Sequence, residues 1–123
     1  YVDAGFMMAA GRCGVDYQEK QSRTAIRFEG NNGLKNLRGT VAMVRHAEYI
    51  HSATSQFFIN LVNNASLDFQ NSSPSGYGYT AFGRVIEGME VVDEIARVAT
   101  GNVRGYSDVP LAPVIITTLQ RGD

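Results

Sequence analysis

Only one stretch of this chain repeats its apolar residues at helical spacing, and this restricts the fold to one with little helix. Within residues 89–99, apolar side chains recur at intervals of three and four residues, which places them on one face of a helix. These positions are Met89, Val92, Ile95, Ala96 and Ala99. Glu90 in the first turn and Gly101 just beyond the last one are typical of helix ends. The sequence therefore predicts a single clear helix over 89–99.

Four other segments have the composition of short β-strands, because β-branched and aromatic residues are frequent in them. They are residues 40–45 (TVAMVR), 55–61 (SQFFINL), 79–85 (YTAFGRV) and 114–119 (VIITTL), with 25–29 (AIRFE) as a weaker candidate. Turn-forming stretches at 30–33, 63–65, 71–78 and 101–110 separate them. This arrangement predicts a mainly antiparallel β domain, a barrel or a sandwich, extending over residues 1–123 as one unit.

Charge and cysteine content exclude several classes of protein. The 123 residues carry 11 Lys+Arg and 12 Asp+Glu, a balance that disfavours nucleic-acid binding. No run of eighteen apolar residues is present, so we expect no membrane partner. The sole cysteine, Cys13, excludes an internal disulfide and fits cytoplasm or periplasm, of which we expect the cytoplasm. Because the sequence starts at Tyr1 without a methionine or a leader, we interpret it as a processed product, a fragment or an incomplete sequence.

The polar residues that usually carry chemistry do not form a recognisable site. His46 and His51 are five residues apart and have no third ligand at a usual spacing, so the sequence predicts no metal and no cofactor. Cys13 has no basic neighbour beyond Arg12 and is interpreted as an ordinary thiol.

In the run SQFFINL, strand alternation places Phe57 and Phe58 on opposite faces of a strand. The outward ring is then either covered or part of an apolar groove.

Several motifs taken together are similar to those of the cyclophilin family, especially its bacterial members. They are, in order, 33–45 (GLKNLRGTVAMVR), 52–60 (SATSQFFIN), 67–68 (LD), 78–85 (GYTAFGRV) and 86–92 (IEGMEVV). The resemblance extends from about Phe6 to the end of the chain. It implies an eight-stranded antiparallel β-barrel capped by helices. It also implies peptidyl-prolyl cis-trans isomerase activity on X–Pro bonds in protein folding, without a cofactor.

The resemblance implies a role for individual side chains in binding a proline-containing peptide or an unfolded protein. In the family, an F-M pair walls the proline pocket, an aromatic residue forms its floor, and two further residues lie on its rim. A glutamine and the main chain of one strand hold the substrate backbone. The corresponding residues here are Phe6, Met7, Val44, Arg45, Gln56, Phe58, Leu67 and Tyr79. Cyclosporin-like ligands are a further candidate, disfavoured by Ser66 at a position where an aromatic residue is common.

Two positions depart from the family's pattern and leave the catalytic residue unassigned. The family's catalytic arginine lies in a strand just upstream of the F-M pair, and an ungapped alignment places Tyr1 there. Alternatively, residues 1–6 match the end of the family's first helix, and Phe6 then loses its place in the pocket. The usual glutamine after the F-M pair is Ala9. The resemblance therefore supports an active isomerase, or alternatively a catalytically weakened proline-peptide-binding module or chaperone.

The family's first strand, first helix and most of its second strand have no counterpart in this sequence. Without them a barrel would have unpaired strand edges. We therefore expect the N-terminally incomplete domain to be completed by residues outside the sequence or by a partner chain, as a monomer or a strand-exchanged dimer.

Overall fold

Seven strands and one α-helix make up the regular structure of this computed structural model, which describes residues 1–14 and 16–122. Their order is β1 (Val2–Asp3), β2 (Met7–Ala10), β3 (Thr40–Met43), β4 (Phe57–Asn60), the 3₁₀ turn η1 (Ala65–Leu67), β5 (Ala81–Arg84), α1 (Met89–Ala96), β6 (Thr100–Val103) and β7 (Tyr106–Pro110). Five strands form one antiparallel sheet in the order β1-β2-β4-β3-β5, and β6 and β7 form a second. The prediction of a mainly antiparallel β protein is confirmed.

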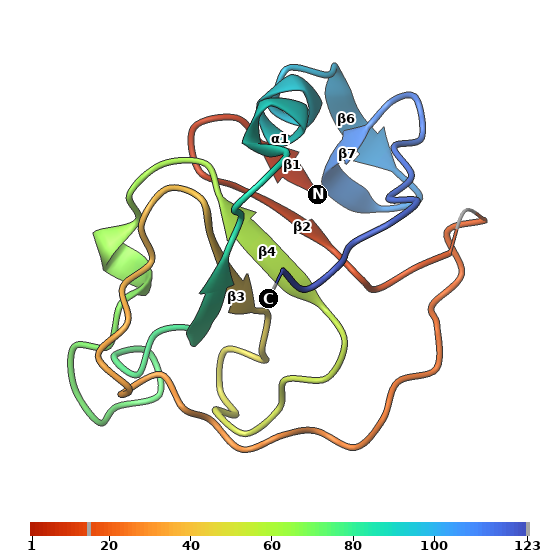
Figure 1. The fold of residues 1–123 in the computed structure, drawn as a ribbon. Helices are drawn as coiled ribbons and strands as arrows, with labels where there is room; N and C mark the ends of the chain where they lie inside the picture. The colour runs from red at the N-terminus through yellow and green to blue at the C-terminus, as the bar shows by residue number, and fades with distance from the viewer. Residues whose placement is uncertain (15, 123) are drawn as a thin grey trace.

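The main sheet carries a separate apolar cluster on each face. The helix-side cluster consists of Val2, Met8, Ile59, Leu61 and Val92. The Phe58 cluster consists of Ala42, Phe58 and Ala81. Phe57 packs against the first cluster and Phe58 belongs to the second, as strand alternation predicts. Figure 1 shows α1 and the β6–β7 hairpin together at the β1 end of the main sheet.

The predicted helix is present but shorter than expected. It begins after Gly88, whose φ of 92° is in the left-handed region, and ends at the C-cap Arg97. Because Thr100 already pairs in β6, the chain leaves the helical conformation before Ala99.

Two predictions from local composition are wrong. Residues 114–119 form no strand, although their sequence favours one, because they pair with no other strand in the described part of the chain. Residues 101–110, predicted as a turn region, lie almost entirely in the β6–β7 hairpin. Arg104 and Gly105 connect its strands with φ of 51° and 86°, which suits the tight turn of a hairpin. The weaker candidate at 25–29 contributes only a single bridge between Ile26 and Ala53.

Short strands without a β-type composition were missed at the N-terminal end. Strand β2 reads MMAA and has no β-branched residue, and β1 is only two residues long, too short for a composition signal. Pairing with β4 holds β2 in place.

The described residues contain no helix with the length and apolar character that a membrane span requires.

Candidate functional site

The N-terminal hairpin decides between the two interpretations of residues 1–6. Strands β1 and β2 pair with Val2 opposite Met8, and a turn through Phe6 joins them. The Ala9 N–H donates to the Tyr1 carbonyl at 2.9 Å, so Tyr1 lies opposite Ala9. This hairpin matches the ungapped alignment, and the alternative reading as a helix end is wrong. Tyr1 and Ala9, the two positions that depart from the family's pattern, therefore form one cross-strand pair.

Phe58 occupies the centre of the candidate site. Its cross-strand neighbours are Ala9 on β2 and Ala42 on β3, two small residues that leave room for the ring between them. Four of the predicted residues surround Phe58 as half-buried side chains, and they are Met7, Val44, Leu67 and Tyr79. The Tyr79 ring meets the Phe58 ring edge to face, with centroids 5.8 Å apart and an interplanar angle of 80°.

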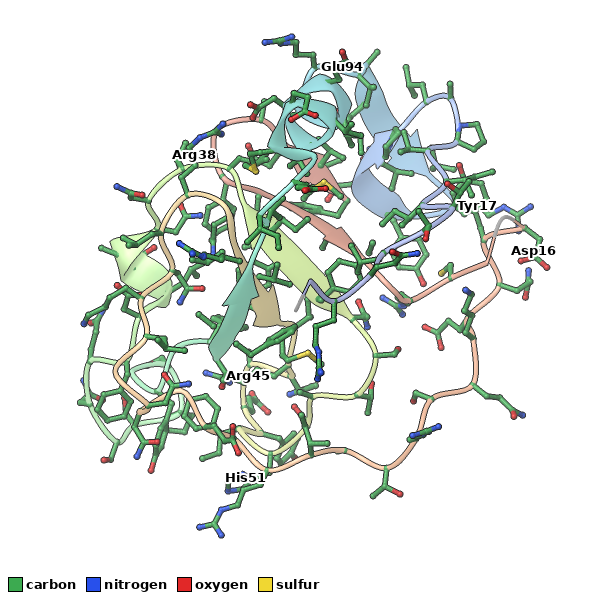
Figure 2. All side chains as sticks on the ribbon, in the orientation of Figure 1. Asp16, Tyr17, Arg38, Arg45, His51 and Glu94 are labelled. Atoms are coloured by element: carbon green, nitrogen blue, oxygen red, sulfur yellow. The ribbon has the colours of Figure 1, made fainter. Side chains whose placement is uncertain are left out.

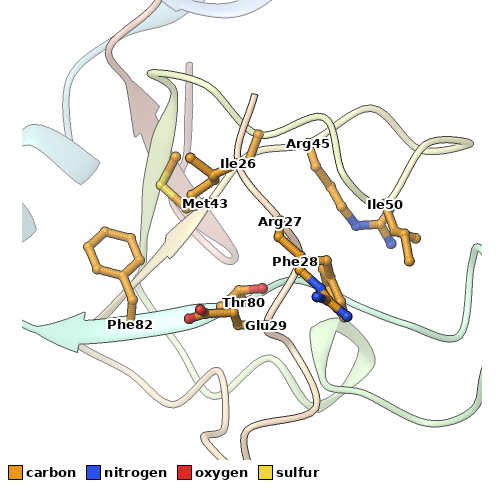
Figure 3. Close-up of a pocket in the computed structure, with 10 residues that line it drawn as sticks. Ile26, Arg27, Phe28, Glu29, Met43, Arg45, Ile50, Thr80 and Phe82 are labelled. Carbon is orange, nitrogen blue, oxygen red and sulfur yellow. The ribbon is translucent and has the colours of Figure 1, made fainter. Parts of the chain in front are cut away.

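The Phe58 ring is covered in this conformation. Only 1% of Phe58 is exposed, and none of Phe58, Met7 and Leu67 lines either of the two cavities described below. The larger of these two cavities has a volume of about 330 Å³ and lies between Met43 and Phe82 on one side and Arg45 on the other (Figure 3). Neither of these cavities gives access to the Phe58 ring in this conformation.

The other predicted residues lie around this cluster with different roles. Phe6 is half-buried in the β1–β2 turn and, unlike Met7, is not among the residues packed against the Phe58 cluster. Gln56 lines a smaller, polar cavity of about 130 Å³ with Lys20 and Ser55. The Val44 N–H donates to the Gln56 carbonyl at 3.0 Å, so this main-chain donor is already used within the protein.

The Arg45 side chain has a structural function that the sequence did not indicate. It is only 8% exposed, and its Nε donates to the Gly78 carbonyl at 2.8 Å and its Nη2 to the Pro74 carbonyl at 2.9 Å. Its guanidinium also lies 4.8 Å from the centroid of the Tyr79 ring. Arg45 thus ties the segment after β3 to the loop that precedes Tyr79. Figure 2 labels Arg45 among the side chains of the molecule.

Three buried asparagines near the site were also missed by sequence reasoning. Asn36, Asn60 and Asn64 are 1%, 0% and 7% exposed. Asn36 and Asn64 lie in segments whose Asn and Gly content resembles that of loops, and loops are usually exposed. The one available signal is Asn60 at the end of the apolar run FFIN, because a buried polar residue needs a partner.

The histidines and Tyr1 show how the polar groups near the site are arranged. His46 Nδ1 accepts a hydrogen bond from the Glu48 N–H, and His51 Nδ1 accepts one from the Phe28 N–H. In the described part of the chain, no group of three His, Cys, Asp or Glu side chains could hold a metal ion.

Burial, followed by the negative charge of Asp3, raises the pKa of the Tyr1 phenol. The phenol is therefore neutral and able to donate a hydrogen bond near pH 7.

These features define a mainly β protein in which an apolar aromatic cluster lies on one face of the main sheet, around the middle strand β4. Residues 2–121 match the sequence model of the family described as cyclophilin type peptidyl-prolyl cis-trans isomerase/CLD, and the chain belongs to this family.

Bacterial relatives cover most of the chain. It is 48% identical over 115 residues to "Peptidyl-prolyl cis-trans isomerase cyp18" of Streptomyces antibioticus, which covers 94% of this chain and 69% of that protein. It is 47% identical over 115 residues to "Peptidyl-prolyl cis-trans isomerase B" of Escherichia coli (strain K12), covering 94% of this chain and 70% of that protein. It is 46% identical over 112 residues to "Peptidyl-prolyl cis-trans isomerase A" of Dickeya dadantii (strain 3937), covering 91% of this chain and 57% of that protein. The family resemblance predicted from the sequence motifs is confirmed.

Proposed function

We propose that this chain is a peptidyl-prolyl cis-trans isomerase that acts on X–Pro bonds in proline-containing peptides and unfolded proteins. Its membership of the family and the names of relatives that are 46–48% identical to it support this activity. Rotation about a peptide bond crosses a barrier of about 18–20 kcal/mol because it destroys amide resonance. A catalyst of this reaction needs an apolar pocket that excludes water from the prolyl ring and hydrogen bonds to the main chain on either side of it. It also needs a hydrogen-bond donor that stabilises the twisted amide more than the planar forms.

The Phe58 cluster is the observation that carries this proposal. It combines a buried aromatic ring with half-buried Met7, Leu67 and Tyr79 on the face of the sheet opposite α1. Such side chains exclude water from a pyrrolidine ring without offering it a polar group. Gln56 and the Val44 carbonyl would hold the peptide on either side of the proline.

Tyr1 and Ala9 set the expected rate of this isomerase. A neutral phenol at Tyr1 is a weaker donor than the guanidinium expected from the family resemblance, and Ala9 has no side-chain amide to hold such a donor. Losing one preorganised donor typically lowers a rate by about 10²–10³-fold. We therefore expect isomerisation that is measurable but slower than in a relative with arginine and glutamine at these positions.

The test compares Phe58→Ala with its neighbour Phe57→Ala. Both variants lose the same ring from β4, but Phe58 belongs to the proposed site and Phe57 packs on the opposite face. The uncatalysed reaction takes tens to hundreds of seconds, so exchange between cis and trans resonances of a short X–Pro peptide measures the catalysed rate by NMR. We expect the wild type to accelerate exchange, Phe58→Ala to lose at least about tenfold in kcat/KM, and folded Phe57→Ala to retain most of it.

Two results would contradict the proposal in different ways. A wild-type chain that binds the peptide without accelerating exchange would be a proline-peptide-binding module. Full activity in Phe58→Ala would place the site elsewhere on the molecule.

A further inference from the structure

Three asparagine side chains form a continuous hydrogen-bonded chain beneath the candidate site, which we call the asparagine network (Asn36, Asn60 and Asn64). The Asn64 Nδ2 donates to Asn60 Oδ1 at 2.7 Å, and the Asn60 Nδ2 donates to Asn36 Oδ1 at 3.1 Å. Within the described residues, no buried side-chain nitrogen or oxygen lacks a hydrogen-bond partner. Because a buried amide is costly unless it is bonded, each of these side chains is confined to one orientation.

The two ends of the asparagine network reach the main chain of the site. The Asn36 Nδ2 donates to the Leu67 carbonyl at 3.0 Å and to the Tyr79 carbonyl at 3.2 Å. At the other end, the Asn64 Nδ2 donates to the Phe6 carbonyl at 2.9 Å, directly before Met7. The network therefore joins three segments that are far apart in the sequence and that carry three of the side chains packed against Phe58.

Asn36 holds the two rim residues most directly. The Leu67 carbonyl accepts both the Asn36 Nδ2 and the Tyr79 N–H, the latter at 2.8 Å, so one amide group and one main-chain bond fix both residues. Asp68 Oδ1 accepts the Asn36 N–H at 2.6 Å and keeps the Asn36 backbone in place. The Asn36 Nδ2 also donates to Asp68 Oδ1 at 3.2 Å, so its two N–H groups serve three acceptors.

We propose that Asn36 is a positioning residue of the proline site, which sets the distance of Leu67 and Tyr79 from Phe58 through the asparagine network. This inference rests on the proposed function. Asn36 does not touch the substrate: it acts through the main chain of the rim, and it determines how far the rim opens when a prolyl ring enters. The other interpretation is that the network stabilises the fold without affecting binding.

The experiment uses Asn36→Asp and Asn36→Ala, with Val92→Ala as the control. Aspartate keeps the shape of asparagine but presents an oxygen, in place of the donor, to the Leu67 and Tyr79 carbonyls and to the Asp68 carboxylate, and alanine removes the group. Val92 is buried in the helix-side cluster and its truncation lowers stability without touching the site. For each variant we would measure the Kd of a short proline-containing peptide, the urea midpoint and the ring resonances of ¹³C-labelled Tyr79.

We expect both Asn36 variants to raise the Kd by about tenfold or more, because Leu67 and Tyr79 lose the main-chain hydrogen bonds that set their distance from Phe58, and small misplacements of site residues weaken binding strongly. The Tyr79 ring resonances should move as its edge-to-face contact with Phe58 changes. Val92→Ala should lower the urea midpoint and leave the Kd and the Tyr79 resonances unchanged. Folded Asn36 variants with a wild-type Kd and wild-type Tyr79 resonances would overturn the inference.

A measurement on the wild type keeps the inference testable if the Asn36 variants do not fold. The side-chain amide protons of Asn36 should exchange slowly with solvent and should shift when the peptide binds, whereas those of exposed Asn31 should do neither. Rapid exchange of the Asn36 amide, or no shift on peptide binding, would overturn the inference. A wild type that binds no proline peptide would contradict the proposed function as well, whereas a binding wild type with unresponsive Asn36 variants would contradict this inference alone.

Discussion

Replacing Arg45 with methionine tests whether one buried guanidinium holds the loop that precedes Tyr79. The change removes the bonds to the Gly78 and Pro74 carbonyls and two further bonds to the carbonyls of His46 and Ala47, at 2.9 and 3.1 Å. His46 and Ala47 are exposed, so water replaces the guanidinium at their carbonyls at little cost.

The expected loss of stability comes mainly from two contacts. Gly78 is buried, and its charge-assisted bond contributes about 2 kcal/mol. The stacking of the guanidinium on the Tyr79 ring contributes about 1 kcal/mol. Together they predict a loss of about 3 kcal/mol in the free energy of unfolding for Arg45→Met. Arg45→Lys keeps the charge but not the fork of donors, so we expect about half of this loss.

Urea unfolding followed by circular dichroism measures the effect, since the chain has no tryptophan. With a slope of about 1.5 kcal/mol/M, a loss of 3 kcal/mol lowers the midpoint by about 2 M. Arg84→Met is the matched control, because Arg84 is an exposed arginine on β5. It should change the free energy of unfolding by no more than about 0.5 kcal/mol. An Arg45→Met variant as stable as Arg84→Met would refute the reasoning.

Three further predictions concern other parts of the molecule. Tyr1→Arg combined with Ala9→Gln should raise kcat/KM about 100-fold in the NMR exchange assay, whereas Ala9→Gln alone should not, and an equal gain from Ala9→Gln alone would contradict the pairing of the two roles. The hydrogen bonds from Arg38 lower the pKa of Asp93, so this ion pair stabilises the fold above the ordinary pKa of aspartic acid, and its contribution to stability is lost as the pH falls through the lowered pKa. Asp93→Asn should therefore make the urea midpoint depend less on pH in the acid range, and an unchanged dependence would exclude this pair as its source. Gly78→Ala should lower the free energy of unfolding by about 2 kcal/mol or more, because φ is 69° there and an added Cβ would overlap the Leu67 carbonyl, and a variant as stable as the wild type would show that the loop relaxes easily.

Stability and function are linked through the segment from Leu67 to Tyr79. The Asn36 side chain donates hydrogen bonds to the carbonyls of Leu67 and Tyr79 at its two ends, and the Arg45 side chain donates one to the carbonyl of Gly78. The hydrogen bonds from both side chains end on main-chain carbonyls, whereas the stacking of Arg45 depends on the Tyr79 ring. A substitution at Leu67 should therefore alter the slot while leaving the loop in place.

Local patterns predicted the elements whose signal is contained in their own residues. The periodicity of 89–99 identified α1, and the alternation in SQFFINL placed Phe57 and Phe58 on opposite faces. The errors at 114–119 and 101–110 arose because a strand exists only where another strand pairs with it, and the pairing partner is not visible in the segment itself.

The sequence by itself determined the family, the mainly β class and which apolar residues are candidates for the site, because these depend on residue types and their order. Only the tertiary structure decided that Tyr1 lies opposite Ala9, that Phe58 is covered, and that Asn36 and Arg45 donate hydrogen bonds to the main chain of Leu67, Gly78 and Tyr79. Arg45 and Gly78 are 33 residues apart, and Asn64 and Phe6 are 58 apart, so their hydrogen bonds form only once the strands have been brought together. A polar side chain in a loop-like segment shows whether it is buried, and what it holds, only after the chain has folded around it.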